Sequence, residues 1–501
     1  MLHLKPGRLV ALGASRCRLL LGLLLGLLLL GTSTAWGQGT ALAARPTADT
    51  ARVFSLQNLA DLVLANHPIV QQAALLSAEA RSQVLQARGG FDPRLSADFR
   101  RKQFGGTEYY NNWSNELKIP LWLAGIDLKA SYDRYVGPYA DPESRTPLAG
   151  LAGVGLTVPL GQGLLLDARR STLRQARVLV DAAEADRAKQ VNEVWLQATK
   201  DYWAWYYMFR QAALLREGVA LADRRYRATA RRVRLGDQAA IDSVEAQLTV
   251  QDRQVQAEQL RAELQNARLV LSNHLWTPDG RPAELPAYAI PQAAALDSVS
   301  QTELQRLADF AAAQHPALRK LDAKISQLGI EERYRRELLK PRLNLSGTLL
   351  GQGDFYRAEV PGPYNFGPGN YKMGVDVAFP LLLRAERGKL QYTRIQVRET
   401  GLERQQSQRV IATQVNTVFN TLRAYERQLA LQARAIAGQQ LLLRAELQKF
   451  ELGESTIFLV NTRETKLIEL QIKQESLRAG YEKSRAELYY YAGTRPAVAA
   501  Q

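Results

Sequence analysis

The chain carries one set of short landmarks twice in the same order, and this repetition limits its possible folds more than any other feature. Four landmarks of the first half return in the second: Asn66-His67-Pro68 as Gln314-His315-Pro316, Asp92-Pro93-Arg94-Leu95 as Lys340-Pro341-Arg342-Leu343, Val158-Pro159-Leu160 as Phe379-Pro380-Leu381, and Leu235-Gly236-Asp237 as Leu452-Gly453-Glu454. Internal repetition indicates that one structural unit is used twice. We expect repeats over residues 55–276 and 302–493, a linker at 277–301 and a tail at 494–501.

The first 37 residues are typical of a secretory signal. An apolar run from Leu19 to Leu30 follows a basic start that contains Lys5, Arg8, Arg16 and Arg18. A membrane anchor is the alternative, but these twelve residues are short for a span of roughly 20. We expect cleavage before Gln38, which leaves an extended segment at 38–54 and removes the only cysteine, Cys17. The mature chain then has neither disulfides nor thiolate metal sites.

The chain is strongly basic, which raises the possibility of nucleic-acid binding. Its net charge is +16, and removal of the four cations of the signal leaves +12. A secreted nucleic-acid binder would require salt-dependent binding. We do not expect nucleic acid as a partner, because the chain is exported and its arginines are spread along polar helix faces.

Segments that alternate apolar and polar side chains follow the proline landmarks of both halves. Leu95, Ala97 and Phe99 share one face, and residues 126–132, 154–158, 343–349 and 373–379 show the same alternation. Such a period of two gives one apolar and one wet face. A soluble sandwich has the same pattern, but charges on the polar face and aromatic residues near the strand ends favour a membrane barrel.

We count two long strands in each repeat, at about 94–160 and 342–380, and about four in the chain. Four strands leave open edges, which lipid does not tolerate, so several chains must pool their strands. Pro93 and Pro159 are 66 positions apart, against 39 for Pro341 and Pro380. The 27 additional residues of the first repeat form either an extra hairpin or an extension of the strands. The Gly/Pro-rich loop Val360–Gly369 is expected on the extracellular side.

Two long proline-free stretches predict helical hairpins at 165–276 and 384–492, which reverse at Gly236 and Gly453. The helix Asp167–Arg234 would be roughly 100 Å long at 1.5 Å per residue. A coiled-coil rod explains these helices but not the strands before them. We expect the aromatic cluster between Tyr202 and Phe209 to be core. Shorter helices are expected as an outer belt around it, at Leu56–Ala65, Ile69–Ala87, Leu304–Gln314 and Leu318–Leu338.

The sequence shows no arrangement of residues for catalysis. His67, His274 and His315 are isolated, without the spacing of a metal site or an acid–base pair. Nucleotide-binding glycine motifs before a helix are lacking too. We therefore expect neither an enzyme nor a cofactor.

The ordered set of landmarks resembles the TolC-type outer-membrane efflux protein family. The likeness rests on the doubled landmarks, on Val158 to Arg170 with the sequence VPLGQGLLLDARR, and on the turn from Arg234-Leu235-Gly236-Asp237 to Asp242. The resemblance covers about Phe54 to Gly493. It implies a mixed α and β membrane protein of two internal repeats, in which a trimeric transmembrane β-barrel continues as a long periplasmic α-helical barrel. Each chain of this family gives four strands to a twelve-stranded barrel.

The resemblance also implies partners and a location. These are outer-membrane lipid, a periplasmic adaptor (membrane fusion) protein, and an inner-membrane pump that is proton-driven or of the ABC type. The homotrimer would sit in the outer membrane of a Gram-negative cell and extend into the periplasm. We expect the outer-membrane channel of a tripartite efflux or type I secretion system, a passive exit duct gated at its helical tip. The alternative is a periplasmic coiled-coil scaffold with a soluble β module.

The resemblance assigns functional roles to residues around the two turns. The adaptor-docking tip is expected at Leu235, Gly236, Asp237, Leu452, Gly453 and Glu454, and the tunnel constriction among Arg231, Arg234, Asp242, Thr456, Leu459 and Asn461. Residues 457–462 contain no aspartate, so this constriction should be more apolar than in members with an acidic ring. Capping of the return helix is the expected role of Asp237. Most of the basic run from Arg224 to Arg234 is interpreted as a solvated face, although some of its members are candidates to bridge neighbouring hairpins.

Overall fold

The computed structural model describes residues 52–352 and 366–496. The expected signal peptide with Cys17, its cleavage site, residues 38–51 of the extended segment, positions 360–365 of the extracellular loop and the end of the tail lie outside the described residues. Within the described ranges, none of the helices combines the length and apolarity required to cross a membrane.

The first half begins with helices and strands and ends with a long helical hairpin. Its elements are β1 (Arg52–Phe54), α2 (Leu56–Asn66), α3 (Pro68–Arg88), the short 3-10 helix η1 (Gly89–Phe91), β2 (Arg94–Phe104), β3 (Thr107–Pro120), β4 (Asp127–Val136), β5 (Leu151–Pro159), α4 (Ala168–Arg234) and α5 (Ala240–Ser272). The helix expected over Asp167–Arg234 corresponds to α4, with Asp167 as its N-cap.

The second half has the same order with two strands in place of four. It contains β6 (Ala289–Pro291), α6 (Gln301–Gln314), α7 (Pro316–Glu337), β7 (Arg342–Gln352), β8 (Tyr371–Ala378), α8 (Arg384–Glu451) and α9 (Ile457–Tyr491). In the segment expected as a linker, β6 pairs in parallel with β1, so this segment is ordered by contacts with the start of the chain.

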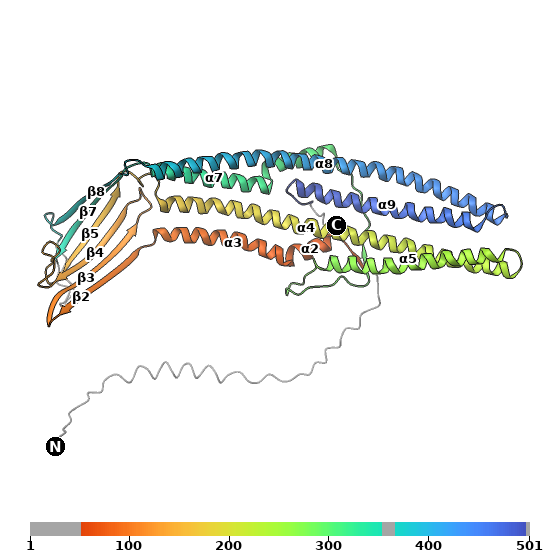
Figure 1. Ribbon diagram of the computed structural model, residues 1–501, viewed down its shortest axis with the longest axis horizontal. Coiled ribbons are helices and arrows are strands. Elements are labelled where there is room, and N and C mark those ends of the chain that lie inside the picture. Colours follow the sequence, from red (N-terminus) through yellow and green to blue (C-terminus); the bar gives the residue numbers. More distant parts are fainter. Residues whose placement is uncertain (1–51, 353–365, 497–501) are drawn as a thin grey trace, which may run out of the picture. The chain divides into compact units, whose positions relative to one another are not determined.

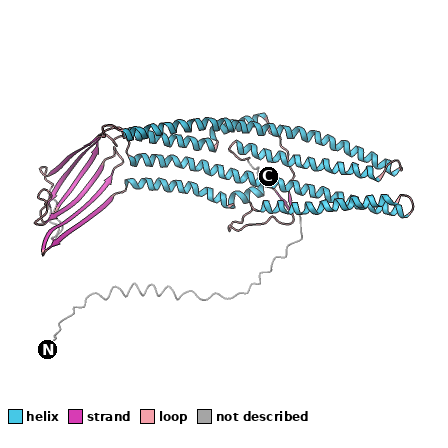
Figure 2. Cartoon of the chain, viewed as in Figure 1, coloured by secondary structure: helices cyan, strands magenta, loops and turns pink. Residues whose placement is uncertain are grey.

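Six strands form one antiparallel sheet in the order β2-β3-β4-β5-β7-β8. Figure 2 shows this sheet at one end of the long helices. The expectation of two long strands in the first repeat is wrong, because the additional residues form an extra hairpin, β3–β4, within the sheet. Apolar alternation did not reveal β3, because residues 110–116 are mostly Asn, Ser and Glu on both faces.

The helices form a layer that is four helices wide along its length (Figure 1). Helix α4 contacts α3 and α7 towards the sheet and α5 and α9 towards the tips, while α8 contacts α7 and α9. Helices α3 and α7 therefore run beside α4 and α8 up to the sheet. Helix α2 and the start of α3 pack on the aromatic cluster, whereas α6 packs against α8, so the expected belt around the cluster is wrong for α6, for α7 and for most of α3.

The aromatic cluster of α4 lies in the core, as expected. Trp203, Trp205 and Tyr206 are buried against α2, α5 and the linker. The fully buried Tyr202 donates its hydroxyl proton to the carbonyl of Phe54 at 2.8 Å and accepts from the Gln292 amide at 2.9 Å. A buried tyrosine hydroxyl needs such partners. This hydroxyl therefore ties β1 and the linker to α4.

The two His-Pro landmarks begin equivalent helices. His67 and His315 are the N-caps of α3 and α7, and their Nδ1 atoms accept the amide protons of Ile69 at 3.2 Å and Ala317 at 3.1 Å. A proline follows each histidine at the first helical position, where a missing N–H costs nothing. The repeated histidines thus have a structural role. Among the described residues, no group of three or more His, Cys, Asp or Glu side chains is arranged to hold a metal.

Candidate functional site at the hairpin tips

Both hairpins reverse through the same backbone motif, whose glycine adopts a left-handed conformation. Gly236 has a φ of +82° and Gly453 a φ of +79°. The amide of Gly236 donates to the Val233 carbonyl, and the next amide, of Asp237, donates to the Arg232 carbonyl at 3.0 Å. This pair of bonds is the Schellman motif, which satisfies the last carbonyls of a helix. The second tip repeats it with Gly453 and Glu454.

Asp237 and Glu454 therefore close the preceding helix through their backbone. The expectation that Asp237 caps the return helix is wrong, because the N-cap of α5 is Ala239, which makes no side-chain capping bond. In the second hairpin the return helix α9 does have a side-chain cap, because the hydroxyl of Thr456 accepts a hydrogen bond from the Leu459 amide at 3.4 Å.

The outermost side chains of both tips are available to a partner. Leu235 is 70 % exposed and Leu452 is 74 % exposed, and both flank the turn glycines. Among the six residues expected to dock the adaptor, Leu235 and Leu452 are the two with large apolar side chains, one at each turn. Asp242 lies in the first turn of α5, where its negative charge interacts favourably with the positive end of the helix dipole.

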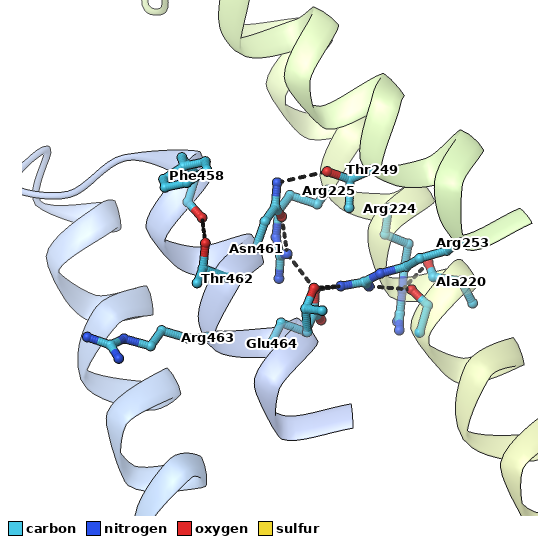
Figure 3. A network of polar contacts seen from close by, with 12 residues as sticks. Ala220, Arg224, Arg225, Thr249, Arg253, Phe458, Asn461, Thr462, Arg463 and Glu464 are labelled. Carbon is cyan, nitrogen blue, oxygen red and sulfur yellow. Dashed lines mark hydrogen bonds and ion pairs between the residues drawn. The ribbon is translucent and has the colours of Figure 1, made fainter. Parts of the chain in front are cut away.

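Behind the tips, a buried carboxylate joins the two hairpins (Figure 3). Glu464 of α9 is 2 % exposed and its Oε2 accepts from Arg225 of α4 at 2.7 Å and from Arg253 of α5 at 3.0 Å. Arg253 is itself buried and also donates to the carbonyl of Gly218 at 2.8 Å. One carboxylate thus holds two guanidinium groups from the other hairpin.

Asn461 extends this network by one helical turn. Its Oδ1 accepts from Arg225 at 2.9 Å and its side-chain amide donates to the Thr249 hydroxyl at 3.2 Å. A constriction candidate of the sequence is therefore buried between hairpins of one chain. Arg225, part of the run interpreted as solvated, belongs to the same network, so that interpretation is wrong for Arg225.

The remaining constriction candidates lie apart from this network. Arg231 and Arg234 are exposed at the end of α4, and the Arg234 Nε donates to the Ala230 carbonyl of its own helix. Leu459 is 40 % exposed.

A second buried carboxylate joins the hairpins nearer the sheet. Glu475 of α9 accepts from the Tyr206 hydroxyl at 2.8 Å and pairs with Arg478 at 2.9 Å and Arg210 at 3.5 Å. Burial and the neighbouring Glu475 carboxylate raise the pKa of Tyr206 to about 12, so the phenol remains a donor. Glu464 and Glu475 thus form two fixed points between α4 and α9.

The charged members of these networks were missed, although the sequence holds a signal for them. Glu464 continues the buried stripe of Ile457 and Val460 at helical spacing, and Arg253 does the same after Ala246 and Val250. A charge on an apolar stripe indicates a buried ion pair. The stripe does not reveal which residue pairs with the buried charge or how far apart the two lie in the sequence.

A groove of about 960 Å³ opens beside the network, between α5 and α9. Most of its lining residues are polar or charged, among them Asp252, Gln256, Thr462, Lys466 and Glu469, and Leu248 and Phe458 lie towards the tip.

A sheet that continues into long paired helical hairpins is the architecture with which known proteins were compared. Residues 59–275 match the model of the Outer membrane efflux protein family. The matched residues cover the first half, and the fold comparison extends over both halves. A comparison with curated protein sequences finds no match.

Solved structures share the fold. The CmeC outer membrane channel of Campylobacter jejuni is 13% identical, with 89% of this chain and 87% of that chain covered and a TM-score of 0.60. The MtrE outer membrane channel of Neisseria gonorrhoeae, solved in its open state, is 14% identical, with coverage of 88% and 89% and a TM-score of 0.63. VceC of Vibrio cholerae is 12% identical, with coverage of 88% and 96% and a TM-score of 0.61. The chain thus shares the fold of solved outer-membrane channels, and its residues 59–275 match the model of an outer-membrane efflux family.

Proposed function

We propose that three copies of this chain form a passive exit duct, a β-barrel in the outer membrane continued by a helical tunnel through the periplasm. The duct carries out transport without catalysis and binds no cofactor. It serves a tripartite efflux or type I secretion system, whose energy comes from an inner-membrane pump of the proton-driven or ABC type.

One observation carries this proposal: the sheet exposes a continuous apolar face and two unpaired edges. Val375 and Val377 of β8 are 66 % and 67 % exposed, and Leu95 of β2 is 76 % exposed. Charges such as Lys129 and Asp376 occupy the opposite face. An apolar outer surface and a polar interior are the pattern of barrels in lipid, and further strands must close the edges.

The gate of the proposed duct lies where the hairpins end. A periplasmic adaptor would engage Leu235, Gly236, Asp237, Leu452, Gly453 and Glu454, and the groove between α5 and α9 beside them. Opening then requires α9 to move against α4 and α5, and this motion strains the bonds of Glu464 with Arg225 and Arg253. Arg231, Arg234, Asp242, Thr456 and Leu459 remain candidates for the constriction between copies, with Asn461 acting through the network.

Cell fractionation and particle mass test this proposal against the scaffold alternative. We expect the chain in the outer-membrane fraction, extracted by detergent only, as particles of three copies. A scaffold with a soluble β module would be released without detergent and would not form trimeric pores. Co-purification of an adaptor and a pump, with loss of the adaptor upon Leu235→Asp and Leu452→Asp, tests the docking tip. Loss of the adaptor upon Leu441→Asp, an exposed leucine of α8 away from the turns, would contradict tip docking.

A further inference from the structure

The extra hairpin β3–β4 is hydrogen-bonded into the sheet on both sides. Strand β3 pairs with β2 from Arg94↔Lys118 to Phe104↔Thr107, and β4 pairs with β5 from Asp127↔Thr157 to Asp133↔Leu151. The hairpin thus separates β2 from β5, and its backbone groups are engaged as fully as those of the other strands.

The apolar and polar faces of the sheet continue across the helix-side part of this hairpin, while Asn115 and Arg134 lie on the apolar face farther from the helices. One row of directly paired residues crosses all six strands on the apolar face, namely Leu95, Leu117, Ala130, Val154, Leu349 and Tyr371. The neighbouring row faces the other way and consists of Arg94, Lys118, Lys129, Gly155, Thr348 and Lys372. A hairpin folded away from the barrel would have no need of an apolar and a polar face in register with its neighbours.

The helix-side turn of the hairpin is fixed to the helical part. Trp122 in this turn packs against Phe91 with ring centroids 5.1 Å apart, and the guanidinium of Arg177 lies 5.8 Å from the Trp122 ring. At the start of β4, Asp127 accepts from Arg169 of α4 at 2.7 Å and pairs with Lys118 at 3.0 Å. These contacts fix the helix-side turn of the hairpin to η1 and α4.

The two edges of the six-stranded sheet are β2 and β8. All neighbours in the sheet are antiparallel, and six is an even number, so β2 and β8 run in opposite directions. The β8 edge of one copy is therefore oriented to pair antiparallel with the β2 edge of a second copy. Such pairing satisfies the exposed N–H and C=O groups of both edges.

We infer that this protein closes a barrel of eighteen strands, six from each of three copies, with β8 of one copy paired to β2 of the next. This inference rests on the proposed trimeric duct and departs from the twelve strands that the family resemblance implies. Because barrel diameter grows roughly linearly with strand number at similar tilt, the barrel would be about 1.5 times as wide as one of twelve strands.

The helical layer has a matching width. Four helices from each copy give twelve around the tunnel, and spacings of about 8–10 Å predict a circumference of about 100–120 Å. Eighteen strands about 4.8 Å apart, tilted by about 40°, give a circumference of about 110 Å. The β-barrel and the helical barrel would therefore have about the same radius. Cargo that passes the tip would then meet no narrower point in the β-barrel.

Disulfide cross-linking in a Cys17→Ser background tests the inference. Ala97→Cys of β2 is combined with Met373→Cys, Val375→Cys or Val377→Cys of β8 in turn. At least one combination should give covalent dimers and trimers on denaturing gels. Within one chain, Ala97→Cys with Asn115→Cys and Ala130→Cys with Val154→Cys should form disulfides without joining copies.

The outcomes separate the strand number from the proposed function. Intrachain disulfides between Ala97→Cys of β2 and cysteines placed at Val154, Leu156 or Val158 of β5 would show that the hairpin is excluded, and would overturn the inference while leaving a trimeric duct. Trimeric particles in which no β2–β8 combination cross-links would overturn the edge pairing. Particles that contain a single copy would refute the proposed duct itself.

Discussion

The Arg253 guanidinium donates to the Glu464 carboxylate at 3.0 Å, and both side chains are almost completely shielded from water although they belong to different hairpins. Removal of one partner from such a buried pair leaves an uncompensated charge and typically costs about 3–5 kcal/mol. The pair therefore resists separation of α9 from α5, the motion that the proposed gate requires.

Glu464→Ala is expected to destabilise the closed tip, because both Arg225 and Arg253 lose their carboxylate. The melting temperature should fall, and the basal ion conductance in planar bilayers should rise above that of the wild type. Glu469→Ala is the matched control, since this exposed glutamate of α9 pairs only with Lys466, also exposed, and such pairs contribute little. Equal conductance of the Glu464→Ala variant and the wild type would argue against the network as a latch.

Gly236→Ala should weaken the first tip by about 1–2 kcal/mol, because an alanine in a left-handed conformation places its Cβ against the following carbonyl oxygen. The space around the glycine is open, so this backbone strain is the whole expected effect. Gly438→Ala is the control: it has open space within α8 and an ordinary helical backbone, where alanine should stabilise slightly. Faster amide hydrogen exchange at Asp237 in the Gly236→Ala variant is the readout, and unchanged exchange would contradict the prediction.

The stability of the protein should depend on pH through His315. Burial, with the nearby Lys189 charge, lowers the pKa of His315 from 6.5 to about 4. The folded state therefore binds fewer protons than the unfolded state. Stability from this group is complete above pH 6.5 and is lost as the pH falls towards 4, by at most about 3 kcal/mol and by less where solvent screens the ring.

His315→Asn tests this pH dependence, since asparagine can cap α7 but does not titrate. The variant should match the wild type at pH 7.5 and should melt at a higher temperature than the wild type at pH 4.5. An identical fall of both melting temperatures between these values would show that His315 is not responsible.

Tyr202→Phe should destabilise the region around α2 by about 1–3 kcal/mol, because the Gln292 amide loses its acceptor and the Phe54 carbonyl its donor in a buried site. Tyr207→Phe is the control, as Tyr207 is only half-buried on the same helix. Thermal unfolding in detergent measures both variants. A Tyr202→Phe melting temperature equal to that of Tyr207→Phe would contradict the role of this hydroxyl.

Local signals predicted the elements that depend on local physics. Gly236 and Gly453 marked the reversals because few other residues adopt the left-handed conformation that ends these helices. Absence of proline marked α4 and α8, and spacing within α4 marked the buried aromatic cluster. In each case the signal lies within a short stretch of the chain, although the aromatic cluster is buried by contacts with distant segments.

Features that depend on distant partners could not be predicted in this way. Glu464 meets Arg225 and Arg253, which are 239 and 211 positions away. Strand β3 lacks alternation over much of its length, and its apolar positions at Trp113, Leu117 and Ile119 become recognisable once its neighbours supply a face. For the same reason Asp237 was assigned to the wrong helix: a side chain able to cap does not reveal that its own amide already closes the preceding turn.

Single-channel recording with purified protein in planar bilayers tests the duct most directly. We expect particles of three copies to insert and to conduct ions, with a low conductance for the wild type and a higher one for Glu464→Ala. A well-folded protein that inserts into the bilayer as a trimer but conducts in neither form, or one that remains monomeric in detergent, would contradict an aqueous path through the molecule.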